Sequence, residues 1–234
     1  MSRVFFAWEL GGDLGHIAPF LPVALALRKR GHETLFAVRD LSHTESLLAG
    51  HGFNAVQAPL SQQKVGGLPH PPLNYTEIML RYGFMHKSGL KALVKAWLQL
   101  FGYFKADLVV ADHSPVALLA ARVARLPRAM FGTGFCSPPH AEPLPNMRPW
   151  LKLPPERLQK YEPAALRITN AVLAELGAPP LVRLADLFEV DEDFLCTFRE
   201  LDQYWNADRR PARYWGVAYG THAGLAAEWP APEG

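Results

Sequence analysis

Short apolar segments bounded by glycine recur along the first 60 residues and predict strands that alternate with helices. The apolar run after Arg3 ends in two glycines, which is typical of a buried strand. Beyond it the apolar residues recur at helical spacing up to a basic run and Gly31, a pattern that suits a helix C-terminus. Strands are expected at 4–10, 32–38 and 53–58, and helices at 19–30 and 41–49. This β-α-β-α-β series predicts an α/β fold: a Rossmann-like open parallel sheet flanked by helices.

The rest of the chain continues the series after a helical insertion. Residues 75–101 predict one kinked helix or two helices, because Gly83 and Gly89 interrupt the apolar spacing. The proline-rich stretches 61–74 and 137–155 predict loops. Further strands are expected at 107–111, 128–131, 194–198 and 212–217, and helices at 114–125, with Ser114 and Pro115 as N-cap and first helical residue, and at 164–176. We expect one domain over 1–219 and a linker or tail over 220–234.

Composition narrows the class of protein. The chain has 234 residues, 49% of them hydrophobic, and a formal net charge of +2, which excludes intrinsic disorder and argues against a dedicated nucleic-acid binder. Cys136 and Cys196 form neither a disulfide framework nor a zinc motif, so we expect no metal site and a reducing compartment. No apolar run is long enough for a membrane span or a signal peptide, so the sequence predicts a cytoplasmic protein.

The loop after the first strand is rich in glycine. Gly11, Gly12 and Gly15 lie between this strand and the next helix, where ligands bind in open parallel sheets. Leu10 stands where a dinucleotide fingerprint has its first glycine, so the loop is a weak nicotinamide signal. The alternative is a tight turn that binds nothing.

Two titratable residues are expected at the same sheet edge as this loop. His16 follows the glycines where the helix is expected to begin, and a helix N-terminus favours the neutral imidazole that a general base needs. Asp112 ends the strand at 107–111. If these two strands are neighbours, the carboxylate can hold the imidazole in one tautomer. The alternatives are that His16 only packs or caps, and that Asp112 only caps the helix at 114–125.

Four segments in order resemble one family of enzymes. They are GGDLGHIAP at 11–19 with LALRKRGHET at 25–34, ADLVVAD at 106–112 with LPR at 126–128, FLCT at 194–197 with ELD at 200–202, and YWG at 214–216. Together they resemble the N-terminal, acceptor-binding half of GT-B-fold glycosyltransferases, a group that includes UDP-glucuronosyl-, UDP-glucosyl- and bacterial macrolide and glycopeptide glycosyltransferases. The resemblance runs from about Val4 to Tyr219.

The resemblance implies roles for individual residues. His16 would be the general base that deprotonates an acceptor hydroxyl, Asp112 would be its partner, and the sugar would be transferred with inversion. Some relatives use an aspartate in the glycine loop, so Asp13 is the alternative base. The acceptor, a small lipophilic molecule, would bind between the helices at 75–101 and the loop at 133–155. The residues expected to contact substrate are Gly11, Gly12, Gly15, Tyr82, Phe84, Thr133, Phe135 and Trp150, whereas Trp97 and Phe101 are expected in the core.

The family's donor site lies mostly in a second domain that this sequence does not show. We therefore expect no cofactor, with a nucleotide-sugar (a UDP-sugar, for instance) as co-substrate bound through a C-terminal domain that is absent here. The chain would be a fragment, a truncated product or one member of a split enzyme, inactive alone, and it could bury the uncovered face as a homodimer. Two other functions stay open: a non-catalytic binding or accessory module that retains the fold, and a nicotinamide-dependent enzyme.

Overall fold

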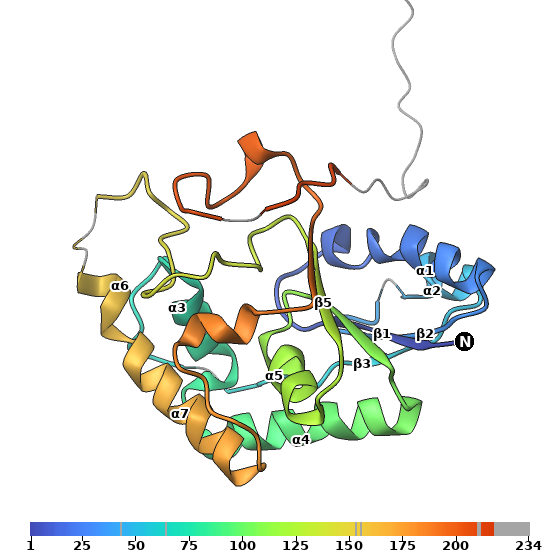
Figure 1. The fold of residues 1–234 in the computed structure, drawn as a ribbon, viewed down its shortest axis with the longest axis horizontal. Helices are drawn as coiled ribbons and strands as arrows, with labels where there is room; N and C mark the ends of the chain where they lie inside the picture. Colours follow the sequence, from blue (N-terminus) through green and yellow to red (C-terminus); the bar gives the residue numbers. More distant parts are fainter. Residues whose placement is uncertain (43, 64, 153, 155, 210–211, 218–234) are drawn as a thin grey trace, which may run out of the picture.

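A computed structural model describes residues 1–42, 44–63, 65–152, 154, 156–209 and 212–217. Its centre is a six-stranded sheet of order β3-β2-β1-β4-β5-β6 in which all neighbouring strands pair in parallel (Figure 1). The strands are β1 (Arg3–Trp8), β2 (Glu33–Val38), β3 (Ala55–Gln57), β4 (Leu108–Asp112), β5 (Arg128–Gly132) and β6 (Glu192–Leu195). The predicted Rossmann-like open sheet is confirmed. Strand order reverses between β1 and β4, the position where such sheets bind ligands.

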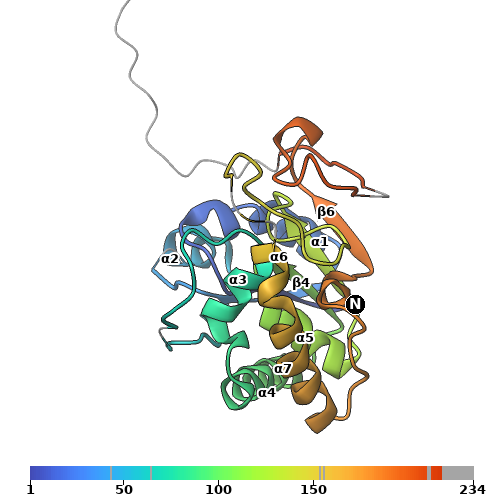
Figure 2. The ribbon, with the colours of Figure 1, turned by 90° about the vertical axis from the view of Figure 1, so that its left-hand side faces the viewer.

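Helices cover both faces of the sheet, as Figure 1 shows. One face carries α1 (Phe20–Lys29) and α2 (Thr44–Leu47), and the other carries α4 (Lys87–Phe104) and α5 (Pro115–Ala124) with α7 (Glu162–Glu175) beyond them (Figure 2). The remaining helices are α3 (Tyr75–Met79) and α6 (Glu156–Lys160), with 3-10 turns at Leu14–His16, Ala49–His51, Leu184–Phe188 and Arg199–Leu201.

The side-chain alternation of β1 explains the two-faced core. Phe5 points into the cluster that includes α4 and α5, while Phe6 and Trp8 point into the cluster that includes α1. Phe5, Phe6 and Trp8 are almost fully buried. A strand covered on both faces is continuously apolar, and this is why the run after Arg3 could be recognised as a strand.

The predicted break in the 75–101 helix is confirmed, and it lies at one of the two glycines. Tyr82 and Gly83 leave the helical conformation within a wide turn at Leu80–Phe84, where Gly83 has a φ of 111°. Any other residue would be strained there, and a Cβ on Gly83 would lie 2.8 Å from Leu93 Cδ1. Gly89 does not interrupt the helix, because it lies inside α4.

Other boundaries differ from the prediction. The strand expected at 212–217 is wrong, because the pairing of these residues is a single isolated bridge between Leu195 and Tyr214. The helix expected at 41–49 is shorter and ends in the 3-10 turn at Ala49–His51, where Gly52 takes a φ of 71°. The chain after β6 lies beside the loop that follows β5 in both views of the ribbon (Figures 1 and 2), and Gln203 donates a 2.6 Å hydrogen bond to the Met147 carbonyl.

Candidate active site

His16 and Asp112 meet at the carboxyl edge of the sheet. β1 and β4 are parallel neighbours whose register sets Trp8 opposite Asp112, so the condition on which the pairing of His16 with Asp112 depended is met. The 3-10 turn after β1 returns His16 to this edge, where its Nδ1 lies 2.8 Å from Asp112 Oδ2. Asp112 therefore binds the imidazole and does not cap α5.

The pair has one buried and one accessible member. The side chain of Asp112 is 7% exposed and that of His16 is 21% exposed. The Trp8 ring stacks on the imidazole at a centroid distance of 5.5 Å and is itself fixed by a 2.6 Å hydrogen bond from its Nε1 to the Leu10 carbonyl. This packing holds the imidazole plane while leaving part of the ring open to a ligand.

Burial raises the pKa of Asp112, and hydrogen bonds from His16 and the Cys136 thiol act against that rise. Burial also raises the pKa of the Cys136 thiol well above its usual value, and the neighbouring Asp112 carboxylate adds to the effect. The thiol consequently stays protonated and serves Asp112 as a hydrogen-bond donor. Asp112 thus has two side-chain partners, His16 and Cys136.

Two glycines, which have no side chain, provide the space that His16 and Asp112 occupy. Gly11 has a φ of 84°, and a Cβ there would lie 2.3 Å from His16 Nε2. A Cβ on Gly132, at the end of β5, would lie 2.6 Å from Asp112 Oδ1. Gly12 has no heavy atom within 4 Å of its Cβ position, so it does not pack against the imidazole as Gly11 does.

Glu9 fixes the loop to α5, a contact that the sequence analysis missed. Its Oε2 accepts hydrogen bonds of 3.0 Å from the backbone N–H groups of Val116 and Ala117. Ser114 occupies the N-cap position, as predicted, but makes no side-chain capping bond there, since Glu9 takes the free N–H groups. The carboxyl is buried, and burial raises its pKa to about 8 against the lowering effect of these two bonds and of Arg39.

His16 was expected where the first helix begins, and the structure places it just before that helix. His16 ends the 3-10 turn, and α1 begins four residues later at Phe20. Ile17 and Pro19 keep helical backbone angles, and the N–H groups of Phe20 and Leu21 bond to the carbonyls of Ile17 and Ala18, so consecutive turns connect the 3-10 turn to α1. Asp13, the alternative base, is exposed with a φ of 63°, and its side chain makes no capping bond.

His113 is a second histidine at this site that sequence reasoning did not single out. Its ring is buried between His16 and Tyr75, 5.6 Å from each ring centroid. Its carbonyl accepts a 3.0 Å bond from Leu10 N–H, which ties the glycine loop to the end of β4. Burial lowers the pKa of His113 to about 3, with smaller contributions from His16 and Arg39, so the ring stays neutral.

A hollow of about 410 Å³ opens beside the pair. It brings together residues from the glycine loop, the ends of β4 and β5, and the chain after β6. Thr133, predicted from the sequence, is among them. The lining residues are Gly15, His16, Pro19, Asp112, Gly132, Thr133, Cys196 and Val217.

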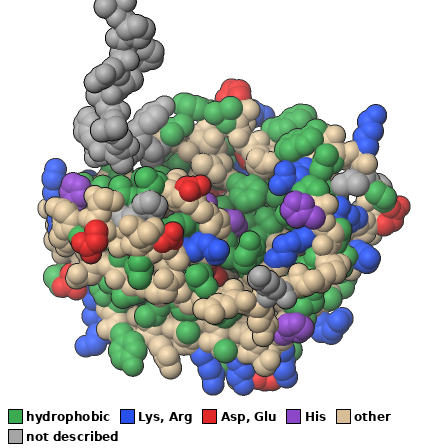
Figure 3. All heavy atoms as spheres, turned by 180° about the vertical axis from the view of Figure 1, so that it is seen from behind, with side chains coloured by type: hydrophobic (Ala, Val, Ile, Leu, Met, Phe, Trp, Pro, Cys, Tyr) green, Lys and Arg blue, Asp and Glu red, His purple; other side chains and the backbone are tan. Residues whose placement is uncertain are grey.

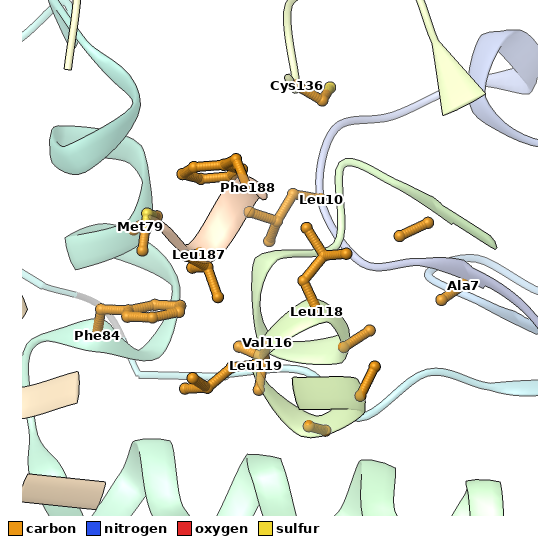
Figure 4. Close-up of a cluster of buried hydrophobic side chains, with 14 of the residues drawn as sticks. Ala7, Leu10, Met79, Phe84, Val116, Leu118, Leu119, Cys136, Leu187 and Phe188 are labelled. Atoms are coloured by element: carbon orange, nitrogen blue, oxygen red, sulfur yellow. The ribbon is translucent and has the colours of Figure 1, made fainter. Parts of the chain in front are cut away.

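The other predicted substrate contacts are scattered. Phe84 is fully buried in the hydrophobic cluster, where it points inward with Met79 toward Leu187 and Leu119 (Figure 4), so it does not line an open surface. Trp150 is 63% exposed on the proline-rich loop. Figure 3 shows hydrophobic side chains gathered near the centre of the rear face, with Lys, Arg and His around them.

Tyr82 and Phe135 are both half-buried. Tyr82 lies under the Arg39 guanidinium at 6.0 Å, and Phe135 meets the His113 ring edge-on at 5.6 Å. Of these two, Phe135 is therefore the one that packs directly against the site. Trp97 and Phe101 are buried, which confirms their predicted place in the core.

Among the residues that the structure describes, no helix combines the length and the apolar character that crossing a bilayer requires.

Comparison with known proteins identifies the fold. No family model and no curated protein matches the sequence. Among solved structures, the glycotransferase of kitacinnamycin is similar over 98% of this chain and 55% of its own, with 18% identity and a TM-score of 0.60. The calicheamicin glycosyltransferase CalG4 is similar over 99% of this chain and 56% of its own, with 18% identity and a TM-score of 0.58. SnogD from Streptomyces nogalater is similar over 99% of this chain and 55% of its own, with 20% identity and a TM-score of 0.54. The chain spans about half the length of these enzymes, and it has the fold of the N-terminal half of GT-B glycosyltransferases.

Proposed function

We propose that this chain is the acceptor-binding half of an inverting glycosyltransferase that moves a sugar from a nucleotide-sugar to a hydroxyl of a small lipophilic acceptor. The observation that carries the proposal is the 2.8 Å contact between His16 Nδ1 and Asp112 Oδ2 at the edge where strand order reverses. A carboxylate in this position fixes the tautomer that leaves Nε2 free to accept a proton, and it stabilises the imidazolium that results.

The proposed step uses His16 as the base. Nε2 takes the proton of the acceptor hydroxyl while the hydroxyl oxygen forms a bond to the anomeric carbon of the sugar. The bond from that carbon to the phosphate oxygen breaks, and the nucleoside diphosphate leaves with the electron pair. Asp112 remains a carboxylate throughout, and its charge offsets the positive charge that develops on the imidazole.

The surroundings of the pair fit a small, largely apolar acceptor. The hollow beside His16 has Pro19 and Val217 in its lining, and its volume of about 410 Å³ lies within the usual range for small-molecule sites. Cys136 and Cys196 are both free and buried, which fits the reducing interior of a cell. The donor would be bound mainly by a second domain, as in the resemblance drawn from the sequence.

The test is a transfer assay on the purified chain with UDP- and TDP-sugars and phenolic or polyketide acceptors. It is run with and without the separately expressed C-terminal half of a GT-B enzyme. Transfer only when the second half is present, lost in His16→Ala and kept in His51→Ala, is the expected result. Survival of transfer in His16→Ala and its loss in Asp13→Ala would assign the base to Asp13. Acceptor binding without transfer in either mixture would favour a non-catalytic module.

A further inference from the structure

A second cluster of polar side chains lies outside the candidate active site. His140 Nε2 is 2.9 Å from Asp186 Oδ1 and 3.2 Å from Glu189 Oε1. These three ligand atoms all lie within 4.8 Å of one another. We propose that His140, Asp186 and Glu189 bind a divalent transition-metal ion of the Zn²⁺ type.

The spacing of the three atoms suits such an ion. Zinc binds imidazole nitrogen and carboxylate oxygen at about 2.0–2.2 Å, so two ligand atoms of a tetrahedral site lie about 3.4 Å apart. The two observed separations, 2.9 Å from His140 Nε2 to Asp186 Oδ1 and 3.2 Å to Glu189 Oε1, are slightly shorter than this value. A small outward movement of the exposed His140 and Glu189 side chains would open the cluster to the ion.

Asp186 is the fixed member of the cluster. Its Oδ2 accepts hydrogen bonds from the backbone N–H groups of Val182 (2.8 Å) and Arg183 (2.9 Å), so Oδ1 alone is presented to His140. These two bonds hold the carboxylate in place. The Arg183 guanidinium is 3.6 Å from Oδ1, but its side chain is 40% exposed and can turn into solvent.

The donor set selects the class of metal. One imidazole nitrogen with two carboxylate oxygens favours Zn²⁺, Co²⁺ or Ni²⁺ over Ca²⁺ and Mg²⁺, which prefer oxygen alone. His140 and Glu189 also line a hollow of about 400 Å³. A fourth ligand, water or a small anion, can enter from that side, where Arg209 lies in the same lining.

The proposed ion would join two segments that support the candidate active site. His140 follows the segment that carries Cys136, the hydrogen-bond donor to Asp112. Asp186 and Glu189 flank Phe188, whose ring lies 5.2 Å from Tyr75. Metal binding would therefore hold together the loop after β5 and the 3-10 turn at Leu184–Phe188, 46 residues apart in the chain.

The experiment is a calorimetric titration of the full 234-residue chain with ZnCl₂ after treatment with EDTA, at pH 7.5. We expect one stoichiometric site, together with a rise in melting temperature on adding Zn²⁺. His140→Ala and Glu189→Gln should each weaken binding by about 100-fold, at or above the effect of losing an outer-sphere partner. Asp186 is left intact, because its Oδ2 caps two backbone N–H groups and its loss would disturb folding.

Matched controls separate this site from others. His51→Ala and Glu192→Gln remove exposed residues outside the cluster and should bind Zn²⁺ as the unaltered chain does. Equal melting temperatures in EDTA show that the variants fold. The proposal is overturned if the chain binds no Zn²⁺, if His140→Ala binds it unchanged, or if His16→Ala is the variant that abolishes binding. In the first case, His140 is only an ion-pair partner of the two carboxylates.

Discussion

Glu9→Gln is expected to flatten the pH dependence of stability. Glu9 is 2% exposed, and its carboxyl caps α5 through the N–H groups of Val116 and Ala117. Burial raises its pKa from 4.5 to about 8, against those two bonds and the charge of Arg39. A glutamine keeps an oxygen that can accept both hydrogen bonds but cannot ionise. The variant thus separates the capping contact from the cost of a buried charge.

The direction and magnitude of this pH dependence follow from the pKa of Glu9 in the unfolded chain, 4.5, and in the folded chain, about 8. The folded chain holds the Glu9 proton more tightly than the unfolded chain does, so stability falls as pH rises from 4.5 to about 8. Each pKa unit corresponds to about 1.36 kcal/mol, which gives a full cost of about 5 kcal/mol above pH 8. Between pH 5.0 and 8.5, the free energy of unfolding of the unaltered chain should fall by about 4 kcal/mol more than that of Glu9→Gln.

Urea unfolding at pH 5.0, 6.5 and 8.5 measures this difference. Other titrating groups, Asp112 among them, are present in both proteins and cancel in the comparison. Glu192→Gln, which changes an exposed carboxylate, serves as the control and should follow the unaltered chain. Parallel stability profiles for the unaltered chain and Glu9→Gln would refute the reasoning, because they would mean that Glu9 titrates alike in the folded and unfolded states.

Three further predictions concern packing and the candidate pair. Gly132→Ala should lower the free energy of unfolding by about 1–3 kcal/mol, because the new Cβ meets Asp112 Oδ1 at 2.6 Å. Gly12→Ala, with open space at its Cβ, should change it by less than about 0.5 kcal/mol, and equal effects in urea unfolding would contradict this. At pH 8, ¹⁵N NMR should show His16 protonated at Nδ1 and bare at Nε2, and the opposite tautomer would remove the proposed base. Trp97→Ala should cost about 3–5 kcal/mol, since its ring is fully buried, and a loss below about 1 kcal/mol in urea unfolding would contradict that placement.

The sheet could be predicted because its strands leave a local signal. β1 is apolar at consecutive positions and ends in Gly11 and Gly12, so its place and end are visible in the sequence. The meeting of His16 and Asp112 needed one more step, the adjacency of β1 and β4, which follows from the usual strand order of such sheets. The expected 212–217 strand failed because its pairing is limited to one bridge at Tyr214, and single-bridge pairing has no periodic signature.

The contacts missed in the sequence depend on three-dimensional packing alone. Glu9 follows an apolar strand directly, and nothing in that pattern indicates that its carboxyl caps a helix 107 residues later. His113 follows Asp112 and would be expected to face solvent, yet its φ of 46° turns the chain so that its ring is buried beside His16. Phe84 was wrongly expected to contact substrate: it ends the wide turn at Leu80–Phe84, and its ring is buried in the core.

Several features that lower the stability of the fold, namely positive φ angles and buried titratable groups, lie close to His16. Their grouping supports a chemical role for this edge of the sheet. Asp13 and His113 have positive φ, a conformation that few non-glycine residues take in the described part of the chain. Asp13 lies in the loop after β1, and His113 follows β4 directly. Glu9, Asp112 and His113 are buried titratable groups at the same edge, and each has a pKa that burial shifts toward its neutral form. A purely structural loop would be more stable with apolar or amide side chains in these places. A functional site is expected to combine strained backbone with desolvated titratable groups, and here both occur where the strand order reverses. This combination favours the glycosyltransferase proposal over a turn that binds nothing.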